Sequence, residues 1–248
     1  MTIYAQARSG SSSLYRCLAP CFNQKKTEGE PFNPDEWKQH PKEIKKAFNK
    51  KIWKWGSDGF NHIFSKTKDM DFIKHVPDVC TFKQNCRILE SSSKIVFLYR
   101  KNQLERVASL WLSHSYKNIM GLDVWAKYSP EYSEFFINKK RPPITNFFIE
   151  KCLSDLDNFL EPIKKYKEEN KTPSMIVSYE SLYSNPEKIK EICELMNIEL
   201  QHDSYNSFFS KDQKLTNIEQ KKKLIPNLQE VEKSFNYSFP AWFLDMEK

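Results

Sequence analysis

The chain has 248 residues, and its 39 lysines and arginines exceed its 32 aspartates and glutamates to give a formal net charge of +7. A chain of this length buries roughly 70–75% of its unfolded surface, so it needs neither disulfides nor a structural metal to form a core. It contains no apolar run of about 18 residues, which argues against a membrane-spanning helix.

The first predicted element is a short strand over residues 2–7 that leads through a loop of small residues into a helix. The loop reads Arg8-Ser9-Gly10 and continues with three serines, Ser11, Ser12 and Ser13. Only 5 glycines occur in the chain, so a glycine before a helix indicates a tight turn. Free backbone N–H groups, hydroxyls and the Arg8 guanidinium predict a phosphate-binding loop. A serine-rich turn that only caps the helix is the alternative.

This loop lacks the lysine that follows the second glycine of the common nucleotide triphosphatase loop, and carries its cation in front, at Arg8. The pattern resembles the sulfotransferase family, whose 5′-phosphosulfate loop runs Lys/Arg-Ser-Gly-Thr/Ser-Thr/Ser. That family uses the donor 3′-phosphoadenosine 5′-phosphosulfate (PAPS) and releases adenosine 3′,5′-bisphosphate. The resemblance implies a P-loop-like three-layer α/β fold with a central parallel sheet, as one domain over residues 1–248. It assigns the 5′-phosphosulfate to Arg8 and to the backbone from Ser9 to Ser13.

The segment after the first helix, Thr27 to Asn33, is where the resemblance places a catalytic base for the acceptor hydroxyl. In bacterial and heparan-type sulfotransferases an acidic residue near a proline or phenylalanine has this role. Glu30 fits best, because Gly29 and Pro31 fix the backbone around it. Glu28 is the next candidate, followed by Asp35 and Glu36. His62 and His75 are the imidazole alternatives, since cytosolic animal members use histidine.

A nearly continuous apolar run over residues 94–100 predicts a buried parallel strand that ends in Arg100. The next segment predicts a helix, because Leu104, Val107 and Trp111 recur at helical spacing, with Ser109 off that stripe. In sulfotransferases an arginine and a serine at such positions bind the 3′-phosphate of PAPS, which implies Arg100 and Ser109. The connection is one residue longer than usual, as in the bacterial carbohydrate-sulfotransferase branch.

Later segments predict a further strand and two helices. Pro142-Pro143 precedes a long helix through Phe148 and Ile163, and Ser174 to Ser178 forms a strand before a helix that buries Ile189 and Met196. Tyr179 and Glu180 are assigned structural roles. Three segments resemble parts of the family that vary with the acceptor or close over the nucleotide. They are the aromatic run containing Trp125, Tyr128, Tyr132, Phe135 and Phe136, and the tail segments Lys214 to Asn217 and Ile225 to Asn227.

Six cysteines without CxxC pairs or zinc-site histidine spacing predict free thiols, and a strand that starts at residue 2 predicts a cytoplasmic location. The sequence therefore predicts transfer of a sulfuryl group from PAPS to a hydroxylated acceptor, a glycan, a glycolipid or a small metabolite, without a metal. Spread lysines argue against a nucleic-acid partner. A small-molecule kinase that uses ATP is the chief alternative, although Arg100 stands where a magnesium-binding aspartate would be expected. A non-catalytic nucleic-acid-binding protein is the third possibility.

Overall fold

The computed structural model describes residues 1–22, 26–34, 44, 46–49, 54–115, 140–169, 172–200 and 218–247. These residues form two compact units. The first comprises Met1–Lys101, Asp155–Asp212 and Pro240–Lys248, and the second comprises Asn102–Ser154 and Gln213–Phe239. The prediction of one sulfotransferase domain over residues 1–248 stays a prediction.

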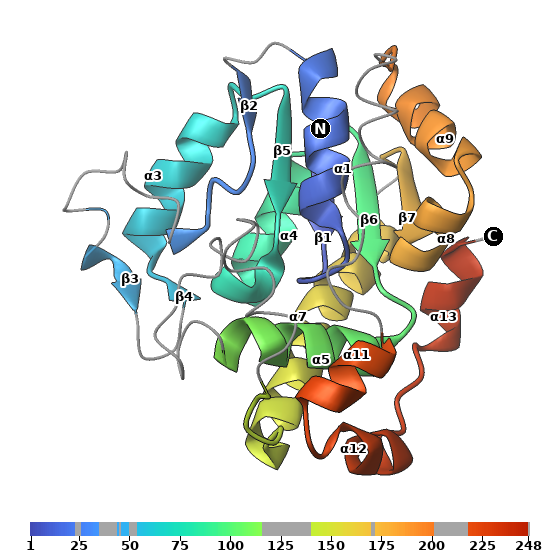
Figure 1. The fold of residues 1–248 in the computed structure, drawn as a ribbon. Helices are drawn as coiled ribbons and strands as arrows, with labels where there is room; N and C mark the ends of the chain where they lie inside the picture. Colours follow the sequence, from blue (N-terminus) through green and yellow to red (C-terminus); the bar gives the residue numbers. More distant parts are fainter. Residues whose placement is uncertain are drawn as a thin grey trace, which may run out of the picture. The chain divides into compact units, whose positions relative to one another are not determined.

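The first unit is built on a five-stranded sheet whose order is β2-β5-β1-β6-β7, and each neighbouring pair is parallel (Figure 1). Its strands are β1 (Thr2–Ala5), β2 (Thr27–Glu28), β5 (Phe72–His75), β6 (Ile95–Tyr99) and β7 (Ser174–Ser178). Because the strands are parallel, the loops after all of them lie at the same edge of the sheet, where open α/β sheets bind ligands. A separate antiparallel pair joins β3 (Phe48–Asn49) to β4 (Lys54–Trp55).

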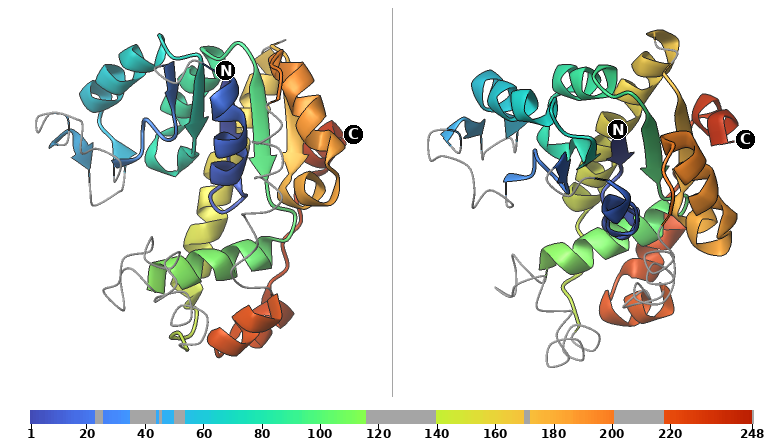
Figure 2. Two further views of the ribbon diagram at one scale, coloured as in Figure 1. Left: turned by 45° about the horizontal axis from the view of Figure 1, so that its top comes forward. Right: turned by 90° about the horizontal axis from the view of Figure 1, so that it is seen from above.

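Helices cover both faces of this sheet, so the unit has three layers (Figure 2). On one face, Ile3, Val96 and Val177 pack against α1 (Ser11–Leu18), α8 (Tyr179–Ser184) and α9 (Glu187–Met196). On the other face, the Tyr4 ring stacks on Phe159 of α7 (Asn146–Glu169), and Tyr99 contacts Phe243 of α13 (Ala241–Leu244). The predicted α/β class with a central parallel sheet is confirmed.

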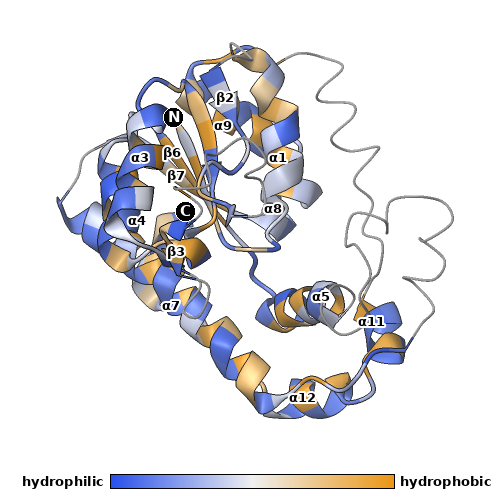
Figure 3. Cartoon of the chain, turned by 90° about the vertical axis from the view of Figure 1, so that its left-hand side faces the viewer, coloured by the Kyte–Doolittle hydropathy of each residue, from blue (hydrophilic) through white to orange (hydrophobic). Residues whose placement is uncertain are grey.

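Two further helices lie beside β5 in the first unit. The helix α3 (Ser57–Thr67) and the helix α4 (Phe82–Glu90) bury apolar side chains together with Ile73. The helix α4 begins with a capping box, in which Thr81 and Gln84 each satisfy the other's backbone N–H. A 3₁₀ helix, Pro77–Val79, connects β5 to α4, and another, Asp245–Glu247, follows α13. Hydrophobic residues run along β6 and β7 between these helical layers (Figure 3).

The second unit is helical in its described part and contains α5 (Gln103–His114), the start of α7, α11 (Ile218–Leu224) and α12 (Leu228–Ser234). Its core contains Val107, Trp111 and Leu228. The Asn227 side chain bonds both the N–H and the carbonyl of Ile144 at 2.8 Å, which ties the start of α12 to the chain before α7. Asn227 thus has a packing partner, and the covering loop implied by the resemblance stays a prediction.

The sequence predictions for the strands around residues 2, 95 and 174 and for the long helix after Pro143 are confirmed. All six cysteines lie in described segments and are free thiols, as predicted. None of the described helices is both long enough and apolar enough to cross a membrane. The sequence analysis did not predict β2, β5, α3 or α4, and these elements contribute to the candidate site.

Candidate functional site

The loop between β1 and α1 is held in a left-handed conformation at two positions. Arg8 has φ 66° and Gly10 has φ 79°, and only glycine adopts such values without steric cost. Between them, Ser9 is fully buried, and its N–H and Oγ both donate to the carbonyl of Gln6, at 3.2 and 2.6 Å. Ser9 therefore fixes the shape of the loop with its Oγ and with its N–H, and the sequence analysis had assigned that N–H to the ligand.

The remaining N–H groups of the loop meet at the N-terminus of α1. The hydrogen bonds of the helix begin where Ser13 and Leu14 donate to the carbonyl of Gly10, each at 3.1 Å. This leaves the N–H groups of Gly10, Ser11 and Ser12 without an acceptor among the described residues. No acidic residue lies in the first turn, so the positive end of the helix dipole is not neutralised there. These groups have the arrangement that binds oxyanions in proteins.

Gly10 also permits close packing behind the loop. A Cβ at this position would lie 2.7 Å from Cδ2 of Tyr179, closer than atoms in contact allow. The Tyr179 ring in turn contacts the guanidinium of Arg100, whose Cζ lies 4.6 Å from the ring centre. Tyr179, assigned a structural role from the sequence, thus packs between the loop and the cation at the end of β6.

The side chain of Lys74 joins the loop to the segment after β2. Lys74 lies on β5, beside Ile3 in the sheet, and is only 4% exposed. Its Nζ donates to Oγ of Ser12 at 2.9 Å and also forms an ion pair with Oε1 of Glu30. One buried ammonium group therefore contacts both the predicted phosphate-binding loop and the predicted base. The sequence analysis did not identify this residue.

Glu30 is the carboxylate that the structure brings to this position. Its Oε2 accepts a hydrogen bond of 2.7 Å from Nδ2 of Asn33, which fixes the carboxylate plane. A pocket of about 140 Å³ opens beside it, and its described lining residues are Glu30, Phe32, Asn33, His75, Val76, Asp78 and Val79. The competing candidate Glu28 lies on β2, where burial raises the pKa of its carboxyl although Lys66 opposes the shift. Of the two, only Glu30 contacts Lys74 and lines the pocket.

The imidazole candidates lie in different places. His62 is part of α3, whereas His75 is buried at the end of β5 and lines the same pocket as Glu30. Burial lowers the pKa of His75 to about 4, since its hydrogen bond to Asn85 only partly offsets the burial and Lys54 adds to the shift. The ring is therefore neutral at pH 7. Its partner is Oδ1 of Asn85, 2.8 Å from Nε2.

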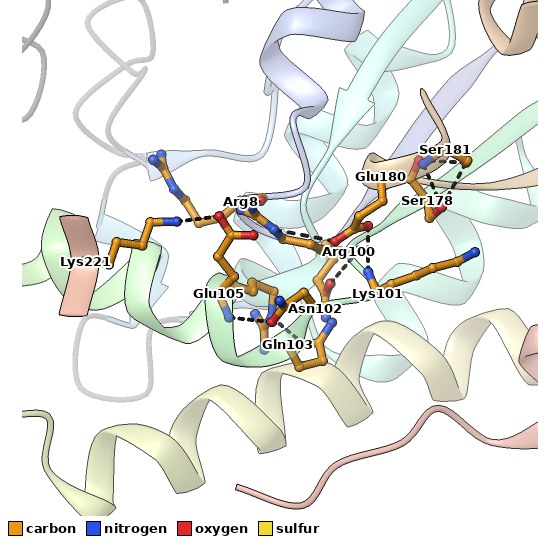
Figure 4. A network of polar contacts seen from close by, with 12 residues as sticks. Arg8, Arg100, Lys101, Asn102, Gln103, Glu105, Ser178, Glu180, Ser181 and Lys221 are labelled. Atoms are coloured by element: carbon orange, nitrogen blue, oxygen red, sulfur yellow. Dashed lines mark hydrogen bonds and ion pairs between the residues drawn. The ribbon is translucent and has the colours of Figure 1, made fainter. Parts of the chain in front are cut away.

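Arg100 follows β6 at the same edge of the sheet and is 4% exposed. Its N–H donates to Oε1 of Gln6 at 3.2 Å, and Nη1 donates to the carbonyl of Arg8 at 3.4 Å. Glu180 approaches Nε of Arg100 at 3.9 Å and accepts a 2.9 Å bond from the N–H of Lys101 (Figure 4). Both predicted arginines, Arg8 and Arg100, are thus brought together at the loop, and Glu180 helps to hold the second.

A further carboxylate, Glu247, supports this edge from the 3₁₀ helix that follows α13. It accepts hydrogen bonds from Tyr99 and from the N–H of Ser178, and forms an ion pair of 2.9 Å with Lys101. Burial raises the pKa of Glu247, but the hydrogen bonds from Tyr99, Lys101 and Ser178 outweigh it and lower the pKa below its ordinary value. Glu247 thus connects the end of β7 at Ser178 to Tyr99 and Lys101, the residues that come before and after Arg100 in the chain.

Ser109 lies on α5 in the second unit and is half-buried. Its pairing with Arg100 at a 3′-phosphate stays a prediction. In the same unit, Nζ of Lys221 forms a buried ion pair of 3.0 Å with Glu105. Asp35, Glu36, the aromatic run from Trp125 to Phe136 and the segment from Lys214 to Asn217 lie outside the described residues.

No protein-family model matches the chain, and no curated protein matches it. Among solved structures, the sulfotransferase domain from the curacin biosynthetic pathway is similar over 99% of this chain and 94% of its own, with 14% sequence identity and a TM-score of 0.41. The function proposed below rests on the geometry of the loop, Lys74 and Glu30 and does not rest on this similarity.

Proposed function

We propose that this protein is a sulfotransferase that transfers a sulfuryl group from PAPS to a hydroxyl of its acceptor. The observation that carries the proposal is the position of Lys74, whose ammonium contacts Ser12 in the loop and Glu30 beside the pocket. Group transfer to a hydroxyl needs an oxyanion site and a proton acceptor within a few ångströms of each other. One buried cation brings these two groups together here.

The loop supplies the donors for the 5′ end of the nucleotide. The N–H groups of Gly10, Ser11 and Ser12 point from the start of α1, and Arg8 is exposed beside them. PAPS, when bound, supplies the sulfuryl group and a stable leaving group. Fixed donors of this kind stabilise negative charge on the leaving oxygen because they need no reorganisation during the reaction. Lys74 adds a positive charge at the same place.

Glu30 is proposed to accept the proton of the attacking hydroxyl. A bond forms between the acceptor oxygen and sulfur while the bridging sulfur–oxygen bond breaks, the proton passes to Glu30, and adenosine 3′,5′-bisphosphate leaves. Each carboxylate oxygen has two lone pairs. Either carboxylate oxygen can therefore accept a hydrogen bond from the acceptor hydroxyl while Oε1 stays paired with Lys74 and Oε2 stays bonded to Asn33. Those two contacts hold the carboxylate in one orientation.

Arg100 is proposed to bind the 3′-phosphate. Arg100 is already oriented by Tyr179 and by the carbonyl of Arg8. An arginine held in this way loses little side-chain entropy when it binds a phosphate. A ligand with a 3′-phosphate should therefore bind more tightly than one without it.

Isothermal titration calorimetry with adenosine 3′,5′-bisphosphate, adenosine 5′-monophosphate and ATP tests this proposal. We expect the bisphosphate to bind most tightly. Arg100→Ala should weaken its binding by about 1.5–3 kcal/mol, the value of one charge-assisted contact, and should barely change binding of the monophosphate. Lys101→Ala is the control, because Lys101 is a neighbouring cation whose exposed side chain pairs with Glu247. Tighter binding of ATP than of the bisphosphate would indicate a kinase instead.

A further inference from the structure

The pocket beside Glu30 has a composition that selects among acceptors. Its volume of about 140 Å³ is close to that of a cavity that holds one six-membered ring. Apolar surface comes from Phe32, Val76 and Val79. Phe32 is packed in place by Phe60, whose ring is stacked 5.4 Å away, and by the edge of His75. The apolar wall is therefore rigid, and a flat or chair-shaped ring can lie against it.

The polar groups of the pocket are mainly hydrogen-bond acceptors. Two carboxylates, Glu30 and Asp78, are among the described lining residues. The amide of Asn33 uses its Nδ2 on Glu30. Neither lysine near the pocket is among the lining residues: Lys74 is turned toward Ser12 and Glu30, and Lys54 donates to the carbonyls of Asp78 and Cys80.

The tautomer of His75 adds another acceptor. Nδ2 of Asn85 donates to the carbonyls of Pro77 and Cys80, at 3.3 and 3.4 Å, so Oδ1 of Asn85 is the atom that faces His75. Because this oxygen can only accept, Nε2 of His75 carries the proton and Nδ1 carries a lone pair. No described residue donates to Nδ1. His75 is 1% exposed and lines the pocket, so it is a buried polar group with one unused acceptor atom.

We infer that this pocket is the acceptor subsite and that it takes one uncharged or cationic ring bearing at least two hydrogen-bond donors, while it rejects rings that carry a carboxylate or a sulfate. The inference rests on the proposed function and names its acceptor class. An anionic ring would place its negative charge against the carboxylates of Glu30 and Asp78, two of the described residues that line the pocket. Repulsion between like charges in a confined pocket excludes a ligand more strongly than the loss of one contact does.

Three methyl glycosides of the same ring size test this selectivity: methyl glucoside is neutral, methyl glucosaminide is cationic and methyl glucuronide is anionic. Saturation-transfer NMR in the presence of adenosine 3′,5′-bisphosphate measures their binding to the full chain. We expect the first two to bind at least roughly tenfold more tightly than the glucuronide. Phenol, which has one donor, should bind more weakly than the glucoside.

Two variants test whether the selectivity among the three glycosides arises in this pocket. Asp78→Asn should bring the affinity for the glucuronide toward that for the glucoside, and Val76→Phe should fill the pocket and remove binding of all three sugars. Asp69→Asn is the matched control, because Asp69 is an exposed acid on the turn after α3. All three variants should bind adenosine 3′,5′-bisphosphate as the unmodified protein does, which also shows that they fold.

The outcomes separate this inference from the proposed function. If the bisphosphate binds but the glucuronide binds as tightly as the glucoside, or if no ring binds, the acceptor inference is wrong and the donor assignment stands. If Val76→Phe leaves sugar binding intact, the subsite lies elsewhere. If the bisphosphate itself does not bind, the proposed function is wrong.

Discussion

A buried lysine–glutamate ion pair occurs in each of the two units, and their surroundings differ. In the first unit, the side chains of Lys74 and Glu30 are 5% and 19% exposed, and the lysine also donates to Ser12. In the second unit, the side chains of Lys221 and Glu105 are 3% and 9% exposed, and they join α11 to α5 beside the apolar core of that unit. The Lys74 pair borders a pocket and the loop that is proposed to bind the phosphosulfate.

The contrast shows that a buried ion pair is informative only through what it contacts. A pair whose two side chains are both less than 10% exposed costs desolvation and returns it through mutual attraction, so its main effect is on folding. A pair at the carboxyl edge of a parallel sheet, next to unused backbone donors, places two charges where a reaction needs them. We therefore expect the two pairs to respond differently to substitution.

The largest effect should follow from Glu30→Gln. The amide keeps the size of the side chain and its contact with Asn33 but cannot accept a proton, so turnover should fall by roughly 10²- to 10⁴-fold. Transfer from labelled PAPS to a panel of glycosides and phenols, or hydrolysis of PAPS, measures this. Affinity for adenosine 3′,5′-bisphosphate should stay unchanged.

Glu28→Gln is the control for that experiment, since Glu28 lies two residues away on β2 and does not line the pocket. It should have a mild effect. If Glu28→Gln abolishes turnover and Glu30→Gln does not, the base is Glu28. If neither matters, His75 becomes the candidate, and the contrast between the two ion pairs loses its functional meaning.

The second effect concerns stability and compares the lysines directly. Lys221→Met removes the ammonium that pairs with the buried Glu105 carboxylate, which should lower the free energy of unfolding by about 3–5 kcal/mol. Lys74→Met should lower it by only about 1–2 kcal/mol, because Glu30 is more exposed and keeps its bond to Asn33. Urea unfolding followed by circular dichroism measures both. Equal losses would contradict the distinction between a stabilising pair and a functional one.

A third and smaller effect should come from Gly10→Ala in the loop. Alanine at φ 79° costs about 1–2 kcal/mol, and its Cβ would press on the Tyr179 ring. Because that ring contacts Arg100, binding of adenosine 3′,5′-bisphosphate should weaken together with stability. Combining the change with Tyr179→Leu removes the clash, and comparison with Tyr179→Leu alone, which also lacks the ring contact with Arg100, leaves only the backbone strain. If Gly10→Ala costs the same stability with and without the Tyr179 ring, contact of the alanine Cβ with that ring does not contribute to the loss.

The sequence predicted the parts of the site that follow long apolar runs. The strand that ends before Arg100 and the loop after β1 have local patterns, an unbroken hydrophobic segment and a glycine before a helix, that do not depend on the rest of the chain. The strand β5 has no such pattern, because two of its four residues are Lys74 and His75. Their burial is possible only through partners distant in sequence, Ser12, Glu30 and Asn85, and no local rule gives these contacts.

The strand β2 illustrates the same limit. It has two residues, Thr27 and Glu28, and among the described strands it pairs with β5, so it is too short to show a period of alternation. Glu30 was nevertheless assigned from its neighbours Gly29 and Pro31, through a family resemblance and not through the geometry. The contact with Lys74 is what distinguishes Glu30 from Glu28, and that contact is a property of the fold.

A last expected effect is a dependence of stability on pH that arises from His75. Burial holds the pKa of this ring at about 4 in the folded protein, below the ordinary value of 6.5. The unfolded chain therefore binds a proton between pH 6.5 and 4 that the folded protein does not, so stability should fall as the pH is lowered through this window and should stop falling on this account below about pH 4. His75→Gln keeps a donor for Asn85 without a titrating ring, so its unfolding free energy should depend less on pH there. Parallel curves for the two proteins would show that His75 is not the group responsible, and would remove the basis for treating it as a neutral acceptor beside Glu30.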